Sequence, residues 1–91
     1  MKQIIREYGT HQKAPHKSRL KPFQEMAVLD AVEYTKTLEH GARRLQMVDM
    51  VFWSQSHTLD GAALKLYVSK STVERWHWEF IYQVGKNMGW F

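Results

Sequence analysis

Polar side chains that suit hydrogen bonding to nucleic acid gather in residues 69–75, which read Ser-Lys-Ser-Thr-Val-Glu-Arg. Hydroxyl groups and a lysine near the start of a helix suit phosphate oxygens. Farther along that helix, the guanidinium of Arg75 can form two hydrogen bonds with guanine, and the carboxylate of Glu74 can accept one from a cytosine amino group. The candidate DNA-binding residues of this helix are Ser69, Lys70, Ser71, Thr72, Glu74, Arg75 and Trp78. The plainer alternative is that Glu74 and Arg75 are solvated surface charges and that Trp78 belongs to the core.

No other group of residues points to catalysis or to metal binding. The five histidines are scattered, and no two of them lie four residues apart on one helix with a carboxylate between them. The glycines near the C-terminus lack both the spacing of a phosphate-binding loop and a preceding strand. The chain has no cysteine, which excludes disulfides and thiolate metal sites. We therefore expect no enzyme activity, no cofactor and no metal.

The apolar spacing predicts that two short helices meet at a tight turn near Tyr67 and Val68. Four apolar residues recur at helical intervals before the turn, and five recur after it. The two stripes are Leu59, Ala62, Ala63 and Leu66, then Val73, Trp76, Phe80, Val84 and Met88. Thr58 can cap the first helix and Ser69 the second, with Ser71 and Glu74 as an alternative capping box. A plain helical hairpin in a small bundle would share this spacing.

Seven of these residues give the stretch a more specific pattern. It resembles the helix-turn-helix of transcription regulators, whose order and spacing are matched by Ala63, Leu66, Val68, Ser69, Thr72, Val73 and Arg75. That family usually has glycine at the turn, because the residue there often adopts a left-handed conformation. This chain has Tyr67, for which that conformation costs about 1 kcal/mol or more. We therefore expect a slightly different turn.

A wider resemblance covers residues 43–90, about half of the chain. This part is similar to the C-terminal part of phage late-transcription activators of the RinA/ArpU kind, which are themselves similar to region 4 of sigma factors. The matching features are the helix at residues 44–52, the segments TLDGAALKL and VSKSTVERW, and the closing apolar helix. The resemblance implies sequence-specific DNA binding in a phage or prophage setting, with the helix that starts near Ser69 in the major groove.

Length and composition predict a single small all-α domain. The chain has 91 residues, and we expect three or four helices in residues 23–91. Helices are predicted over residues 23–39 and 42–55, from Leu59, and from about Ser69 into the Gly85 region. Gly41 is expected to end the first of them or to bend it, and Trp90 and Phe91 are expected to fold back onto the core.

The basic residues are concentrated at the N-terminus. Residues 1–22 hold six of the 13 lysines and arginines but one of the nine acidic residues. Both prolines lie there, and residues 9–22 show no apolar periodicity, so we expect residues 1–22 to form a flexible basic arm. A turn or two of helix in residues 1–8 is an alternative for the start of this arm. Its Lys17, Arg19 and Lys21 are candidate phosphate contacts, because phosphate attraction supplies much of the affinity for nucleic acid. A solubilising tail is an equal alternative.

The partners and the location follow from the same features. We expect DNA as the main partner, with RNA polymerase and a second copy of the chain as further candidates. No apolar run approaches the length of about 20 residues that spans a membrane, and no secretory signal begins the chain, so a cytoplasmic protein is expected. Two rivals remain: a phage small terminase that initiates DNA packaging, and a protein-interaction module that uses the helical bundle.

Overall fold

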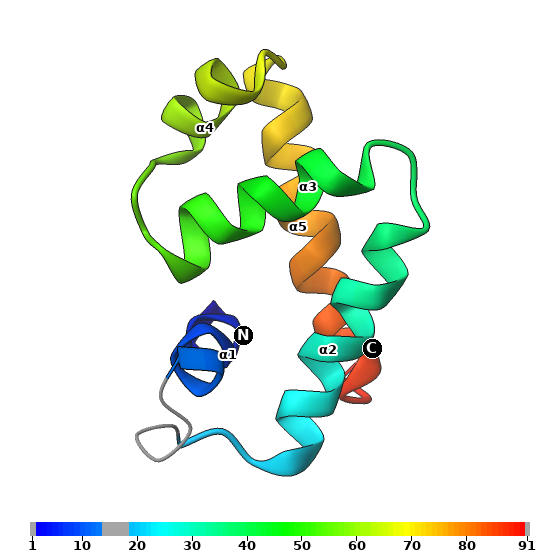
Figure 1. Ribbon diagram of the computed structural model, residues 1–91. Helices are drawn as coiled ribbons and strands as arrows, with labels where there is room; N and C mark the ends of the chain where they lie inside the picture. Colours follow the sequence, from blue (N-terminus) through cyan, green and yellow to red (C-terminus); the bar gives the residue numbers. More distant parts are fainter. Residues whose placement is uncertain (1, 14–18, 91) are drawn as a thin grey trace.

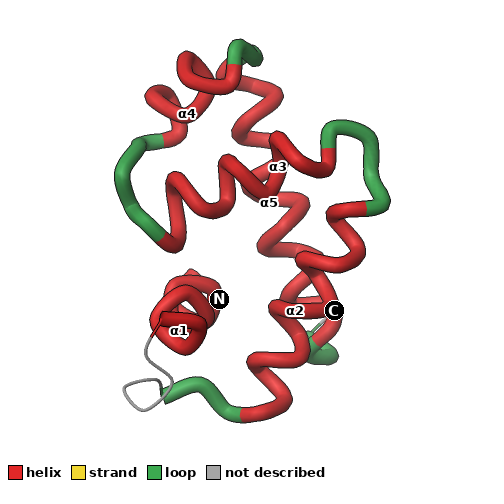
Figure 2. Tube along the Cα trace, viewed as in Figure 1, coloured by secondary structure: helices red, strands yellow, loops and turns green. Residues whose placement is uncertain are grey.

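The chain is all-helical in a computed structural model that describes residues 2–13 and 19–90. Helices account for 78% of the fold, and no strand occurs in the described ranges. The elements are α1 (Lys2–Lys13), α2 (Pro22–Lys36), α3 (Gly41–Val48), the π-helical turn η2 (Asp49–Trp53), α4 (Leu59–Leu66) and α5 (Lys70–Asn87). Figure 1 shows α3 crossing α5, with α2 alongside and α4 at one end. From α2 onward the links between successive helices are short, at residues 37–40, 54–58 and 67–69 (Figure 2).

The N-terminal residues form a packed helix, which corrects the prediction of a flexible arm for residues 2–13. Ile5 is fully buried and Tyr8 is 7% exposed, so α1 contributes to the core. Their spacing is helical, but it covers a single turn among charged and polar residues, which made the signal weak. The described residues therefore hold five α-helices instead of the three or four expected, and the additional one is α1. Lys17 lies outside the described residues.

Helix α1 is held mainly by Trp53 at the end of η2. The indole Nε1 of Trp53 donates to the carbonyl oxygen of Ile5 at 2.9 Å, and its ring packs against Tyr8 with the centroids 5.7 Å apart. A Cβ on Gly9 would lie 2.9 Å from Cδ1 of Trp53, so glycine permits this close approach. Part of the affinity of α1 for the bundle therefore depends on a residue more than forty positions away in the sequence.

Helix α5 forms the centre of the bundle because its buried face meets α2, α3 and α4. Val73 and Val84 on this helix are fully buried, as are Val28 of α2 and Val48 of α3. The amide Nδ2 of Asn87 donates to the carbonyl oxygen of Ala27 at 3.0 Å, which ties the last turn of α5 to the first half of α2. The apolar stripe predicted for this helix is confirmed, and α5 extends to Asn87.

Gly41 begins α3 and does not end α2, which corrects the predicted boundary. Helix α2 stops at Lys36, and His40 adopts a left-handed conformation with φ 59° just before α3. A Cβ on Gly41 would lie 2.5 Å from the carbonyl oxygen of Thr35. Only glycine lets the chain turn this close to the end of α2.

The C-terminal end of α5 turns outward at Gly89, whose φ is +80°. Gly89 N donates to the carbonyl oxygen of Lys86, and Trp90 N donates to that of Gly85 at 2.9 Å, which is the Schellman pattern. Trp90 is 57% exposed, so the prediction that it folds back onto the core is wrong. Phe91 is outside the described residues. No helix in the described ranges is both long enough and apolar enough to cross a bilayer.

Candidate nucleic-acid interface

The turn between α4 and α5 is built on Tyr67 in the left-handed conformation, with φ 57° and ψ 42°. Tyr67 N donates to the carbonyl oxygen of Leu64 at 3.3 Å, and Val68 N donates to that of Ala63 at 3.1 Å. These two bonds form a Schellman motif, the pattern that glycine usually completes. The expectation that tyrosine would force a different turn is therefore wrong. The ring of Tyr67 is 91% exposed and meets no packing constraint.

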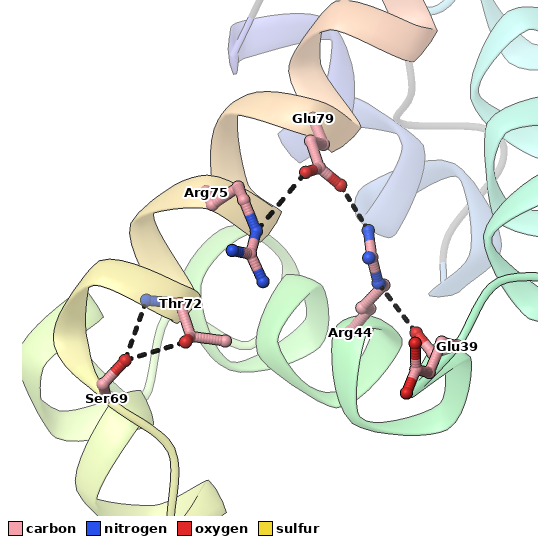
Figure 3. Close-up of polar contacts among 6 residues, drawn as sticks. All are labelled: Glu39, Arg44, Ser69, Thr72, Arg75 and Glu79. Atoms are coloured by element: carbon pink, nitrogen blue, oxygen red, sulfur yellow. Dashed lines mark hydrogen bonds and ion pairs between the residues drawn. The ribbon is translucent and has the colours of Figure 1, made fainter.

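Hydroxyl side chains cap both helices of this pair, as the sequence predicts. The Thr58 hydroxyl accepts a hydrogen bond from Gly61 N at 3.1 Å at the start of α4. At the start of α5, the Ser69 hydroxyl accepts one from Thr72 N at 3.2 Å and lies 2.7 Å from the Thr72 hydroxyl (Figure 3). Because α5 begins at Lys70, the cap is Ser69 and not the alternative at Ser71. The Ser69 cap fixes where α5 begins and so the direction of its first helical turn.

The first two turns of α5 separate anchoring side chains from exposed ones. Val73 is fully buried and Trp76 is 2% exposed, which confirms their predicted inward positions. The exposed residues of this part are Lys70, Ser71, Glu74 and Arg75, while Thr72 is half-buried. Trp78 is 59% exposed, so the alternative that it lies in the core is wrong. The structure thus presents most of the predicted side chains to solvent on one short helical segment.

Carboxylates lie close to both basic residues of this segment. Lys70 Nζ is 3.3 Å from Asp60 Oδ1 of α4 and 4.0 Å from Glu74 Oε1. Arg75 Nε is 3.6 Å from Glu79 Oε1 one turn further on. Exposed pairs of this kind contribute about 0–1 kcal/mol each, so a phosphate or a base edge can replace the carboxylate at little cost. The pairs also weaken the positive potential of the free surface.

Arg44 of α3 lies behind this surface and holds one of its carboxylates, Glu79. The sequence gives no sign of this role. Its guanidinium binds the same Glu79 carboxylate that pairs with Arg75, and its Nε donates to the carbonyl oxygen of Glu39 at 3.1 Å (Figure 3). It also lies over the ring of Trp76, 5.6 Å from the centroid. Arg44 therefore orients Glu79, which in turn holds Arg75. No local pattern connects residues of two helices 35 positions apart.

His77 of α5 is a buried histidine. It is 5% exposed and stacks on Phe52, with ring centroids 5.1 Å apart. Burial lowers the pKa of His77, and the nearby positive charge of Lys2 lowers it further. His77 is therefore a neutral core residue beside the exposed face of α5.

The basic residues expected from the N-terminal segment are not brought to the start of α5. Arg19 and Lys21 are exposed, and they lie beside the first turn of α2. That turn is near the far end of α5, as the bond between Asn87 and Ala27 shows. The 18 residues of α5, at about 1.5 Å each, place its two ends about 27 Å apart. Arg19 and Lys21 therefore do not form one surface with residues 69–75.

Residues 2–13 and 19–90 contain no group of three or more histidine or carboxylate side chains that could hold a metal ion. Comparisons of the chain with protein-family models, with curated protein sequences and with solved structures gave no match.

Proposed function

We propose that the chain is a sequence-specific DNA-binding transcriptional regulator, in which α4, the turn and α5 act as a helix-turn-helix. The observation that carries the proposal is the capped start of α5, where buried Val73 and Trp76 anchor the helix while Lys70, Ser71 and Arg75 remain exposed. A helix that enters the major groove contacts base edges with its N-terminal residues. The resemblance to phage late-transcription activators supports the same role.

The polar side chains at the start of α5 have two tasks in this proposal. The hydroxyls of Ser69, Ser71 and Thr72 and the ammonium of Lys70 contact phosphates, which positions the helix. Arg75 leaves Glu79 and forms two hydrogen bonds with a guanine. Because Arg44 remains bound to Glu79, the released carboxylate keeps a cationic partner. Arg75 can therefore exchange partners without leaving Glu79 uncompensated.

Selection of bound sequences from a random duplex library, followed by affinity measurements across salt, tests the proposal. The selected site should bind more weakly as salt rises, because phosphate contacts release counterions. Arg75→Ala should lose about 1–3 kcal/mol of discrimination at one base pair. Lys86→Ala is the matched control, since Lys86 is an exposed cation in the last turn of the same helix. No binding at low salt, or equal losses for Arg75→Ala and Lys86→Ala, would contradict the proposal.

A second candidate, a protein-interaction module, is favoured by a cleft between α2, α3 and α5. The cleft has a volume of about 360 Å³, and Tyr34 and Tyr82, which are 49% and 53% exposed, are among its lining residues. Exposed aromatic side chains around a recess are typical of surfaces that receive a protein side chain. Substitution of Tyr34 and Tyr82 by serine separates the two functions: it should spare DNA affinity if the chain is a DNA reader and abolish capture of a partner if it is an interaction module.

A further inference from the structure

Helix α1 brings an additional positive charge to the exposed face of α5. Lys2 Nζ lies 5.3 Å from the centre of the Trp78 ring, a cation–π contact. Trp78 is three residues beyond Arg75, one turn along α5. The ammonium group therefore stands next to the surface that the proposed function assigns to DNA, although Lys2 is 76 positions before Trp78 in the sequence.

The position of this charge is set by a packed helix. Ile5, three residues after Lys2, is fully buried, and its carbonyl oxygen accepts the hydrogen bond from Trp53 Nε1. Arg6 is exposed and lies four residues after Lys2, so the two cations share one face of α1. Helix α1 thus holds Lys2 beside Trp78 of α5, with Arg6 one turn further along the same face of α1.

The two cations also differ from those of α5 in their surroundings. Lys70 and Arg75 are paired with carboxylates, whereas none of the ion pairs among the described residues includes Lys2 or Arg6. Glu7, the acidic residue of α1, is half-buried. Lys2 and Arg6 therefore supply positive charge that no neighbouring acid neutralises within the described part of the chain.

The spacing along α5 fits a duplex. Ser71 and Trp78 are seven residues apart, which corresponds to about 10 Å along a helix axis. The major groove is about 12 Å wide, so groups near these two positions can reach phosphates on opposite sides of it. We propose that Lys2 and Arg6 bind the sugar-phosphate backbone of duplex DNA on the side of the groove opposite the Ser69 and Ser71 hydroxyls.

This inference rests on the proposed function and assigns α1 a role within it. Contacts to phosphate add affinity for every sequence and add no preference among bases. The pair Lys2 and Arg6 thus strengthens binding, while Arg75 selects the site. The predicted basic arm would then be replaced in function by the first turn and a half of a folded helix.

The test compares the full chain with the double variant Lys2→Gln/Arg6→Gln, using the selected duplex and a scrambled duplex in fluorescence anisotropy between 50 and 200 mM salt. Removal of two phosphate contacts should reduce the slope of log affinity against log salt by about 2 for both duplexes, so that the variant loses about tenfold less affinity over this range. The charge-preserving variant Lys2→Arg/Arg6→Lys should keep the slope of the parent chain, and Lys86→Gln should also keep it.

An unchanged slope in Lys2→Gln/Arg6→Gln, with sequence-specific binding intact, would overturn this inference and leave the proposed function standing. A changed ratio of affinities for the two duplexes would overturn the assignment to phosphate. If the parent chain binds neither duplex at low salt, the proposed function itself fails. Far-UV circular dichroism of each variant checks that α1 remains folded, which is expected because both side chains are exposed.

Discussion

Replacement of Tyr67 by glycine should make the protein more stable. Tyr67 occupies a left-handed position, with φ 57°, at the end of α4. For an L-residue other than glycine this conformation brings Cβ close to the following carbonyl oxygen. The side chain is 91% exposed, so its removal sacrifices almost no buried apolar area. Both backbone hydrogen bonds of the turn involve main-chain atoms that glycine retains.

The magnitude follows from two opposing terms. Relief of the left-handed strain contributes about 1–2 kcal/mol. The greater conformational entropy of glycine in the unfolded chain opposes this by about 0.4–1 kcal/mol. Tyr67→Gly should therefore raise the free energy of unfolding by about 0.5–1 kcal/mol. For a domain of this size, that corresponds to a rise in Tm of about 2–8 °C.

Urea and thermal denaturation, followed by circular dichroism, measure this change. Tyr67→Ala is the matched control, because it removes the same exposed ring but keeps the Cβ that causes the strain. It should give no stabilisation of comparable size. Equal stabilities for Tyr67→Gly and Tyr67→Ala would refute the reasoning, since the turn would then carry no strain attributable to Cβ.

Three further predictions concern the caps, the glycines and the buried histidine. Ser69→Ala should cost about 1 kcal/mol in urea denaturation, whereas Ser69→Gly should cost a few tenths, because glycine is itself a tolerated N-cap; equal costs would contradict the cap. Gly41→Ala should destabilise the protein by about 1–3 kcal/mol, because the new Cβ would lie 2.5 Å from the backbone carbonyl oxygen of Thr35. Gly61→Ala should instead stabilise α4 by about 0.5–1 kcal/mol, because the nearest atom to its new Cβ is the Thr58 hydroxyl at 3.5 Å. An unchanged stability in Gly41→Ala would refute the close approach. Burial lowers the pKa of His77 in the folded state, so as pH falls below about 6.5 this histidine is protonated in the unfolded chain before it is protonated in the folded one. The free energy of unfolding should therefore be constant above this pH and decline below it. The urea midpoint should fall less with pH in His77→Phe, and an equal fall would contradict the burial of a neutral His77.

Local chemistry made α4 and α5 predictable from the sequence. Thr58 and Ser69 each precede a helix by one residue, and the apolar stripes that follow have helical spacing, so start points and buried faces were readable without distant contacts. The exposure of Arg75 follows from the burial of Val73 and Trp76 on the same helix. The sequence pattern alone therefore predicts the candidate surface.

Long-range contacts determined the remaining features. Helix α1 is held by Trp53 against Gly9, and Arg44 reaches Glu79 from another helix, so neither arrangement has a local signal. The same is true of Lys2 beside Trp78. At Tyr67 a local preference is overridden, since the backbone hydrogen bonds of the turn outweigh the cost of about 1 kcal/mol that a tyrosine has in the left-handed conformation. By itself, the sequence specified which residues begin and line the last two helices, because caps and periodicity act over a few positions. Only the tertiary structure decided what lies beside them, because packing joins residues that the chain keeps far apart.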